Sequence, residues 1–186
     1  MSEHLVCLSD LEARAAAEGR LRLIVRPAVP PAPFDVGDDI TVEWATGSIK
    51  SPLGAPGDVL LCKETIWYPT CMNCGTLKYV ADHPGRPGYM YERVPAPRVP
   101  RNLIRHRLPV AEAGVMRAGD MTEDQFRDTG IVPVMEDSGG TDMAGQWIEI
   151  PHYEPAYAAE FTRRWGRKVR FEDNPWLWWT RVGEGG

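Results

Sequence analysis

The spacing of apolar residues along the chain predicts three short helices. Near the N-terminus, apolar residues recur every three or four positions, at Leu5, Leu8, Leu11 and Ala15. This period predicts a helix over 5–18 that ends at Gly19, because glycine is favoured just after a last helical turn. Thr122 is a suitable N-cap, so a second helix is predicted over 123–128. A third, over 156–165, has one apolar face formed by Tyr157, Phe161 and Trp165.

Short apolar runs, and alternation of apolar with polar residues, predict a series of short strands. The predicted strands cover residues 20–26, 40–44, 59–62, 77–81, 102–110, 115–117 and 176–182. In the last of these, alternation places Trp176 and Trp178 on one face of the sheet and Leu177 and Trp179 on the other.

Proline and glycine are frequent, with 17 and 18 residues, and they mark the breaks between these elements. The segment 83–100 is dense in both and predicts a long irregular loop. Residues 136–145 are polar and contain glycine, which predicts a flexible insertion. Together with the short strands and modest helices, these features predict a single domain over 1–186, of the α+β class and centred on a small β-barrel.

Charge and composition narrow the classes of function. The formal net charge is −5, which excludes a polyanion-binding patch over the whole surface, so a nucleic-acid contact needs a local basic face. No apolar run reaches the ~18–20 residues that span a bilayer, and no membrane contact is predicted. The N-terminus lacks a basic region followed by an apolar one, and four cysteines do not indicate a disulfide scaffold. We therefore expect a cytoplasmic protein.

From about residue 19 to residue 179 the chain resembles phage and prophage proteins with an ASCH-like (PUA-like) domain, and five segments, in consistent order, are similar to that family's motifs. Gly57-Asp58 with Lys63-Glu64-Thr65 and Trp67 is similar to the family's "GD-x-L-W-V-R-E-T-W". The others are 77–82, similar to "Y-R-A-D"; 99–105, similar to "M-P-R-x-x-S-R"; 120–131, similar to "I-S-E-E-D-A-x-x-E-G-I"; and 161–178, similar to "F-x-x-L-W" followed by "N-P-W-V-W". The resemblance implies an α+β fold of the PUA-like (ASCH-type) kind, a small β-barrel with flanking short helices. It also implies binding of nucleic acid or a modified nucleotide, in a host cytoplasm if a phage encodes the chain.

Within the first motif, Glu64 aligns with the glutamate of "R-E-T". Glu64 is suited to accept hydrogen bonds from the Watson–Crick edge of a base, and Trp67 to offer a stacking face beside it, with Lys63 adjacent. The alternative is a Lys63–Glu64 ion pair at a strand end, next to a core tryptophan.

The first predicted strand argues against one family chemistry. Enzymatic relatives resemble "G-R-K-T-x-T-x-R" there, and their lysine and threonine act with a glutamate in amide hydrolysis. Here Gly19-Arg20 fits, but Leu21 and Arg22 replace the lysine and threonine. Leucine has no ionisable group, and arginine, with a pKa above ~12, cannot serve as the base. No catalytic residue is assigned, and Arg20 and Arg22 are candidate nucleic-acid contacts, the alternative being solvated charges on a half-buried strand.

A local basic run lies between residues 93 and 117, with six arginines and one acid, Glu112. Arginine donates through a planar fork that suits phosphate. The candidate phosphate contacts are Arg98, Arg101, Arg105 and Arg107. A second basic stretch covers 163–170. If the two stretches lie on one face of the molecule, they form a groove that follows the phosphates of a nucleic acid. The alternative is a solvated loop that balances the acidic segment 120–142.

Cys71 and Cys74 have the spacing of half a zinc knuckle. A second cysteine pair is missing, so Cys62, His83 or His106 would have to complete the site. The alternative is a pair of unliganded loop cysteines, and no other cofactor is predicted.

The sequence therefore predicts a non-catalytic protein that binds nucleic acid, RNA rather than DNA, or a modified nucleotide. Two alternatives stay open. One is a small hydrolase of the same superfamily, either an amidohydrolase or a ribonuclease. The other is a phage morphogenesis or host-interaction protein.

Overall fold

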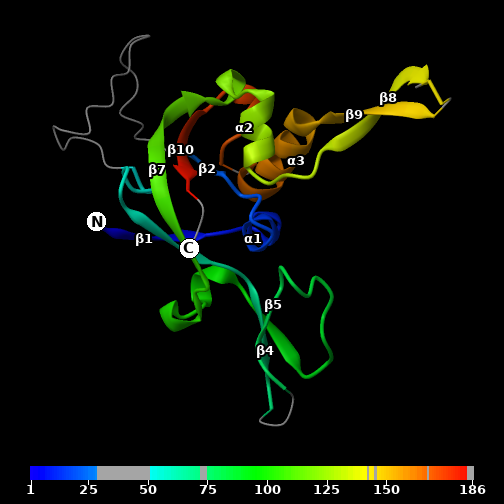
Figure 1. Cartoon of the computed structure of the whole chain (residues 1–186). Helices are drawn as coiled ribbons and strands as arrows, with labels where there is room; N and C mark the ends of the chain where they lie inside the picture. Colours follow the sequence, from blue (N-terminus) through cyan, green and yellow to red (C-terminus); the bar gives the residue numbers. More distant parts are fainter. Residues whose placement is uncertain (29–50, 72–74, 142, 145, 167, 184–186) are drawn as a thin grey trace.

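A computed structural model describes residues 1–28, 51–71, 75–141, 143–144, 146–166 and 168–183 (Figure 1). Its main sheet has five strands in the order β1–β3–β7–β10–β2. Their bounds are β1 Glu3–Cys7, β2 Leu23–Pro27, β3 Val59–Lys63, β7 His106–Arg117 and β10 Trp176–Val182. Helices accompany the strands, so the predicted α+β class is confirmed.

The long strand β7 connects the two halves of this sheet. Its first residues pair antiparallel with β3, with His106 opposite Cys62, and the remainder pairs antiparallel with β10. β1 lies parallel to β3, and β2 antiparallel to β10. Within the described residues the sheet does not close into a barrel, because β1 and β2 are its two unpaired edges. There the Arg26 side chain donates to the Cys7 carbonyl oxygen (2.9 Å), a contact that joins β1 and β2 without a strand ladder.

Two smaller sheets extend from the main one. The first has the order β5–β4–β6, with β4 at Ile66–Pro69, β5 at Lys78–Tyr79 and β6 at Tyr91–Val94. The prediction of an irregular loop over 83–100 is therefore wrong in part, since β6 pairs with β4 despite the surrounding prolines. The second is a hairpin of β8 (Val134–Thr141) and β9 (Trp147–His152), which projects from the body in Figure 1. It replaces the flexible insertion predicted over 136–145.

The helices are α1 (Asp10–Ala17), α2 (Glu123–Asp128) and α3 (Tyr153–Trp165). α1 starts later than predicted because residues 3–7 pair with β3. Its N-terminus is a capping box, in which the Ser9 hydroxyl accepts from the Glu12 N–H and the Glu12 carboxylate accepts from the Ser9 N–H. α2 has the predicted bounds and the predicted cap at Thr122. No helix in the described part of the chain is long and apolar enough to cross a membrane.

β10 separates two apolar cores, as its alternation predicted. Trp178, with Trp176 beside it, faces the core shared with α1, β1 and β3. Leu177, with Trp179 beside it, faces the core shared with α2 and α3, where Phe161 is fully buried. The strand predicted over 102–110 begins later, at His106, because Arg101–Leu103 form a 3₁₀ turn, and it continues through the strand predicted over 115–117 as the single strand β7. The predicted strand over 40–44 lies outside the described residues.

Candidate nucleic-acid interface

An ion network around one buried carboxylate forms where the β3–β7 ladder ends. Glu64 follows β3 and is 2% exposed, and Arg105 immediately precedes β7. The guanidinium holds Glu64 through two bonds, Nε to Oε1 at 2.7 Å and Nη2 to Oε2 at 2.9 Å. It also donates to both oxygens of Asp82, at 2.6 and 3.0 Å. Most of its five N–H donors are therefore used inside the protein.

Two aromatic rings complete this network. The Arg105 guanidinium lies 4.0 Å from the centroid of the Tyr79 ring, a cation–π contact, and the Tyr79 hydroxyl donates to the Leu103 carbonyl oxygen. His106 Nε2 lies 3.6 Å from Glu64 Oε1 and, within the described structure, has no hydrogen-bond partner. Burial lowers the pKa of His106, so this ring is neutral at neutral pH.

The network borders a polar cleft of about 150 Å³, which we call the β7 cleft. Its walls include Leu21, Arg22, Arg105, His106 and Arg107. A wider cleft of about 570 Å³, the α2 cleft, adjoins it and is lined by Arg20, Arg22, Arg127, Asp128, Val132 and Tyr153 among others. Both clefts include Gly19 and Arg22 in their walls, so they are neighbours, and we call the two together the groove. Five arginines and one acidic residue line it.

Two residues predicted to contact nucleic acid, Lys63 and Trp67, make contacts within the protein. Lys63 Nζ donates to the Pro97 carbonyl oxygen at 3.2 Å and makes no pair with Glu64, whose partner is Arg105. Trp67 is 9% exposed, packs with Val80 and Tyr91, and donates its Nε1–H to the His83 carbonyl oxygen. In this conformation Trp67 therefore offers no open ring face for stacking.

Acidic side chains from the N-terminal segment pair with three of the six arginines of the basic run. Glu3 forms ion pairs with both Arg101 and Arg107, and Arg93 pairs with Asp10 at 2.5 Å. Arg98 is exposed, and its side chain makes no ion pair or hydrogen bond with any described residue. Among the described residues, the acids that pair with this run thus come from β1 and α1, together with Glu64 and Asp82, and none comes from 120–141.

The second basic stretch contributes to a different buried network, which the sequence did not indicate. Glu12 is 9% exposed and accepts hydrogen bonds from Arg26 Nη1 (2.6 Å) and from Arg164 Nη1 (2.8 Å). Both guanidinium groups also lie against the Trp165 ring. Burial alone raises the pKa of Glu12, but the two arginines outweigh it and lower this pKa to about 2. Arg164 is thus part of the fold rather than of a phosphate-binding face.

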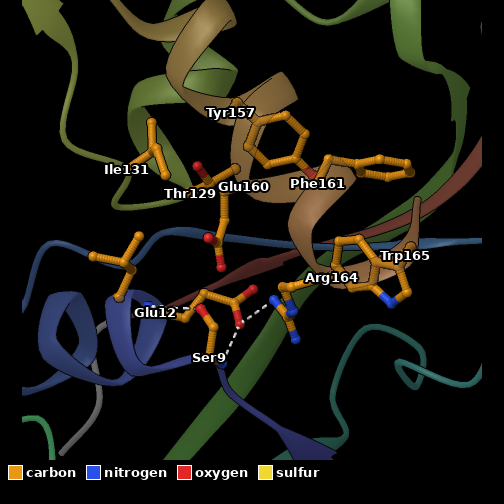
Figure 2. Close-up of a pocket in the computed structure, with 10 residues that line it drawn as sticks. Ser9, Glu12, Thr129, Ile131, Tyr157, Glu160, Phe161, Arg164 and Trp165 are labelled. Atoms are coloured by element: carbon orange, nitrogen blue, oxygen red, sulfur yellow. Dashed lines mark hydrogen bonds and ion pairs between the residues drawn. The ribbon is translucent and has the colours of Figure 1, made fainter. Parts of the chain in front are cut away.

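Figure 2 shows the Glu12–Arg164 part of this network beside a small cavity. The cavity is lined by the start of α1, by α3 and by Thr129 and Ile131, which follow α2. Glu12 and Arg164 meet at its lower edge, and Tyr157, Glu160 and Phe161 come from α3 above. The cavity holds about 20 Å³, far less than a nucleotide requires. Elsewhere in the stretch, Arg163 pairs with Glu160 and Arg170 with Glu172, while Arg167 lies outside the described residues.

The cysteines give no zinc site within the described residues. Cys71 is disulfide-bonded, whereas zinc requires a thiolate, and Cys74 lies outside the described part of the chain. Cys62 is fully buried, which raises the pKa of its thiol to about 12. No cluster of three potential ligands is found among the described histidine, cysteine, aspartate and glutamate residues.

No protein-family model, curated protein or solved structure matches this chain. The resemblance to ASCH-like domains rests on the motif residues alone. Three of those motifs nevertheless meet in space, because Glu64, Tyr79 with Asp82, and Arg105 belong to separate segments and form one network. The sequence pattern indicated Glu64 and Arg105 as candidates but not their contact, since 41 positions separate them.

Proposed function

We propose that this chain is a non-catalytic nucleic-acid or modified-nucleotide binding protein with a PUA-like, ASCH-type fold, acting in the cytoplasm. The groove made of the β7 and α2 clefts supports this proposal, because it gathers Arg20, Arg22, Arg105, Arg107 and Arg127 in a chain of net charge −5. A local excess of cations in a concave surface favours a polyanionic ligand.

The ion pairs of the groove arginines do not oppose such a ligand. Arg20 pairs with Glu18, Arg107 with Glu3 and Arg127 with Asp124, all between substantially exposed side chains. Exposed pairs of this kind contribute at most ~1 kcal/mol each, so a phosphate group can replace the carboxylate at little cost. Within this proposal, Arg20, Arg22, Arg107 and Arg127 contact phosphates.

Arg105 and Glu64 have a supporting role in this proposal. Arg105 gives most of its donors to two carboxylates, so it shapes the wall of the β7 cleft and has little left to donate to a phosphate. Both Glu64 oxygens accept from Arg105, which leaves no unpaired oxygen to act as a general base. The enzymatic alternative consequently has less support than binding.

The test is fluorescence anisotropy with short labelled RNA and DNA, single- and double-stranded, across a salt series. We expect the tightest binding to single-stranded RNA, with affinity that falls as salt rises. An Arg22→Gln, Arg107→Gln double variant should bind more weakly, and its log–log salt slope should be shallower by about 0.7 to 0.9 for each phosphate that it no longer neutralises. Arg163→Gln, on the exposed surface of α3, is the matched control and should bind as the parent does.

Three outcomes would overturn the proposal. The first is no binding to any of the four nucleic acids or to free modified nucleosides at low salt. The second is an equal loss of binding in the control variant. The third is turnover of an acylated nucleoside or of RNA that disappears in Glu64→Gln, since this would indicate an enzyme.

A further inference from the structure

The hairpin β8–β9, which we call the arm, exposes apolar side chains on both of its faces. Val134, Met135 and Ile150 are 45%, 49% and 45% exposed. Met135 lies opposite Pro151, and Ile150 lies opposite Glu136, so these apolar residues fall on opposite sides of the ribbon. Neither strand pairs with a third strand among the described residues. A two-stranded ribbon in water is marginally stable at best, so this arm needs a covering surface.

The arm carries only negative formal charge. Between residues 134 and 152 the sequence has four acids, Glu136, Asp137, Asp142 and Glu149, and no lysine or arginine. The segment therefore combines apolar and anionic groups, and a matching surface must combine apolar and cationic ones.

The α2 cleft has that complementary composition and lies at the root of the arm. Arg20, Arg22 and Arg127 supply the cations, and Ile131, Val132 and Pro133 supply apolar surface directly before β8. Val132 is 61% exposed there. In Figure 1 the arm extends away from the body, so it does not fold back over its own cleft.

From this match of charge and of exposed apolar surface we infer that the arm docks in the α2 cleft of a second copy of this chain. The α2 cleft includes residues 131–133, and the arm begins at the next residue, Val134. A two-fold axis close to these residues therefore places each arm over the α2 cleft of the other copy. Such an interface is isologous and closes on itself as a dimer. The eight residues of β8 reach ~26 Å, and two exchanged arms bury on the order of 1,000 Å², the lower limit for a specific interface. The dimer should thus be reversible.

The test is sedimentation velocity of the full chain over a concentration series, without nucleic acid. We expect a monomer–dimer equilibrium. Arg127→Glu should raise the dimer dissociation constant about tenfold or more by placing like charges together. Adding Glu136→Lys in the same chain should restore dimerisation, because the lysine on the arm of one copy can then pair with the glutamate in the cleft of the other copy. Arg163→Glu, the matched charge reversal on α3, should leave the dissociation constant unchanged.

A monomer at every concentration would overturn this inference, and so would a dimer that neither Arg127→Glu nor an Ile150→Ser, Met135→Ser variant weakens. Unchanged circular dichroism of each variant shows that it is folded, since all of these side chains are exposed. The dimer does not rest on the proposed function. If both hold, single-stranded RNA and the arm compete for the α2 cleft, and adding RNA shifts the equilibrium towards monomer.

Discussion

At the scale of single residues, two carboxylates in the described part of the chain are buried, and arginine neutralises each of them. Glu12 joins β2 and α3 to the start of α1 through Arg26 and Arg164. Glu64 joins the end of β3 to the start of β7 through Arg105. Removing one partner of a buried pair is costly because the other charge remains without its counterion. These residues are therefore sensitive positions although neither carboxylate contacts a proposed ligand.

Glu64→Gln is expected to destabilise the fold by about 2 kcal/mol. The value lies below the ~3–5 kcal/mol typical of a fully buried pair, because Arg105 is partly exposed and keeps Asp82 as a partner. Urea unfolding followed by circular dichroism measures the difference in free energy of unfolding. Glu18→Gln, which removes an exposed partner of Arg20, is the control and should cost less than ~0.5 kcal/mol. Equal stability of both variants would contradict a structural role for the network.

Glu12 makes stability dependent on pH in the acid range. Its pKa is about 2 in the fold, against 4.5 for an unperturbed glutamate, so the carboxylate form is favoured by folding. The resulting stabilisation, about 3 kcal/mol, is fully present above pH 4.5 and is lost as pH falls towards 2. Comparing the free energy of unfolding at pH 6 and at a pH near 2 tests this. Glu12→Gln should be less stable at pH 6 and should lose less on acidification; parallel pH profiles of the two proteins would refute the assignment.

At the scale of elements, one glycine sets how closely α2 approaches α1. Gly130 follows α2 with φ +75°, and a Cβ there would overlap the Cβ of Ala15 in α1. Gly19 follows α1 with a similar φ of +69°, but a Cβ there meets no atom within 4 Å. The two glycines share the same backbone requirement and differ only in packing.

Gly130→Ala is therefore expected to cost more than Gly19→Ala. The left-handed backbone alone costs ~1–2 kcal/mol for alanine, which is the full effect expected at Gly19. At Gly130, displacement of α1 should add ~1–3 kcal/mol, the usual cost of overpacking. Urea unfolding of the two variants measures the difference, and equal losses would show that α1 and α2 are not tightly packed at this point.

The sequence predicted those elements whose geometry depends mainly on residues within the element itself. The alternation of β10 and the capping residue of α2 each determine their own geometry, and both predictions are confirmed. The strand β6 was missed because its partner β4 lies more than 20 residues away, beyond a segment rich in proline and glycine. Likewise, the Glu12 network joins three elements that only the tertiary fold brings together, and no local pattern marks such a contact.

At the scale of the whole molecule, the arm lies outside the apolar cores that stabilise the fold. Among the described residues, the apolar clusters include none from 134–152. The groove arginines come from other elements, with Arg22 before β2, Arg107 in β7 and Arg127 in α2. The arm should thus be removable without loss of the body or of its groove.

Replacing residues 135–151 with Asn-Gly tests this separation, because Val134 and His152 are paired and a two-residue turn can join them. We expect the midpoint of thermal unfolding to change by no more than about 4 °C, which for a domain of this size corresponds to ~1 kcal/mol. Single-stranded RNA should bind with an unchanged salt slope, since every groove arginine remains. Scanning calorimetry and anisotropy on the same preparation give both quantities. A fall in the unfolding midpoint much larger than this would mean that the arm belongs to the folding unit, because the loss of an independent ribbon cannot destabilise the two cores.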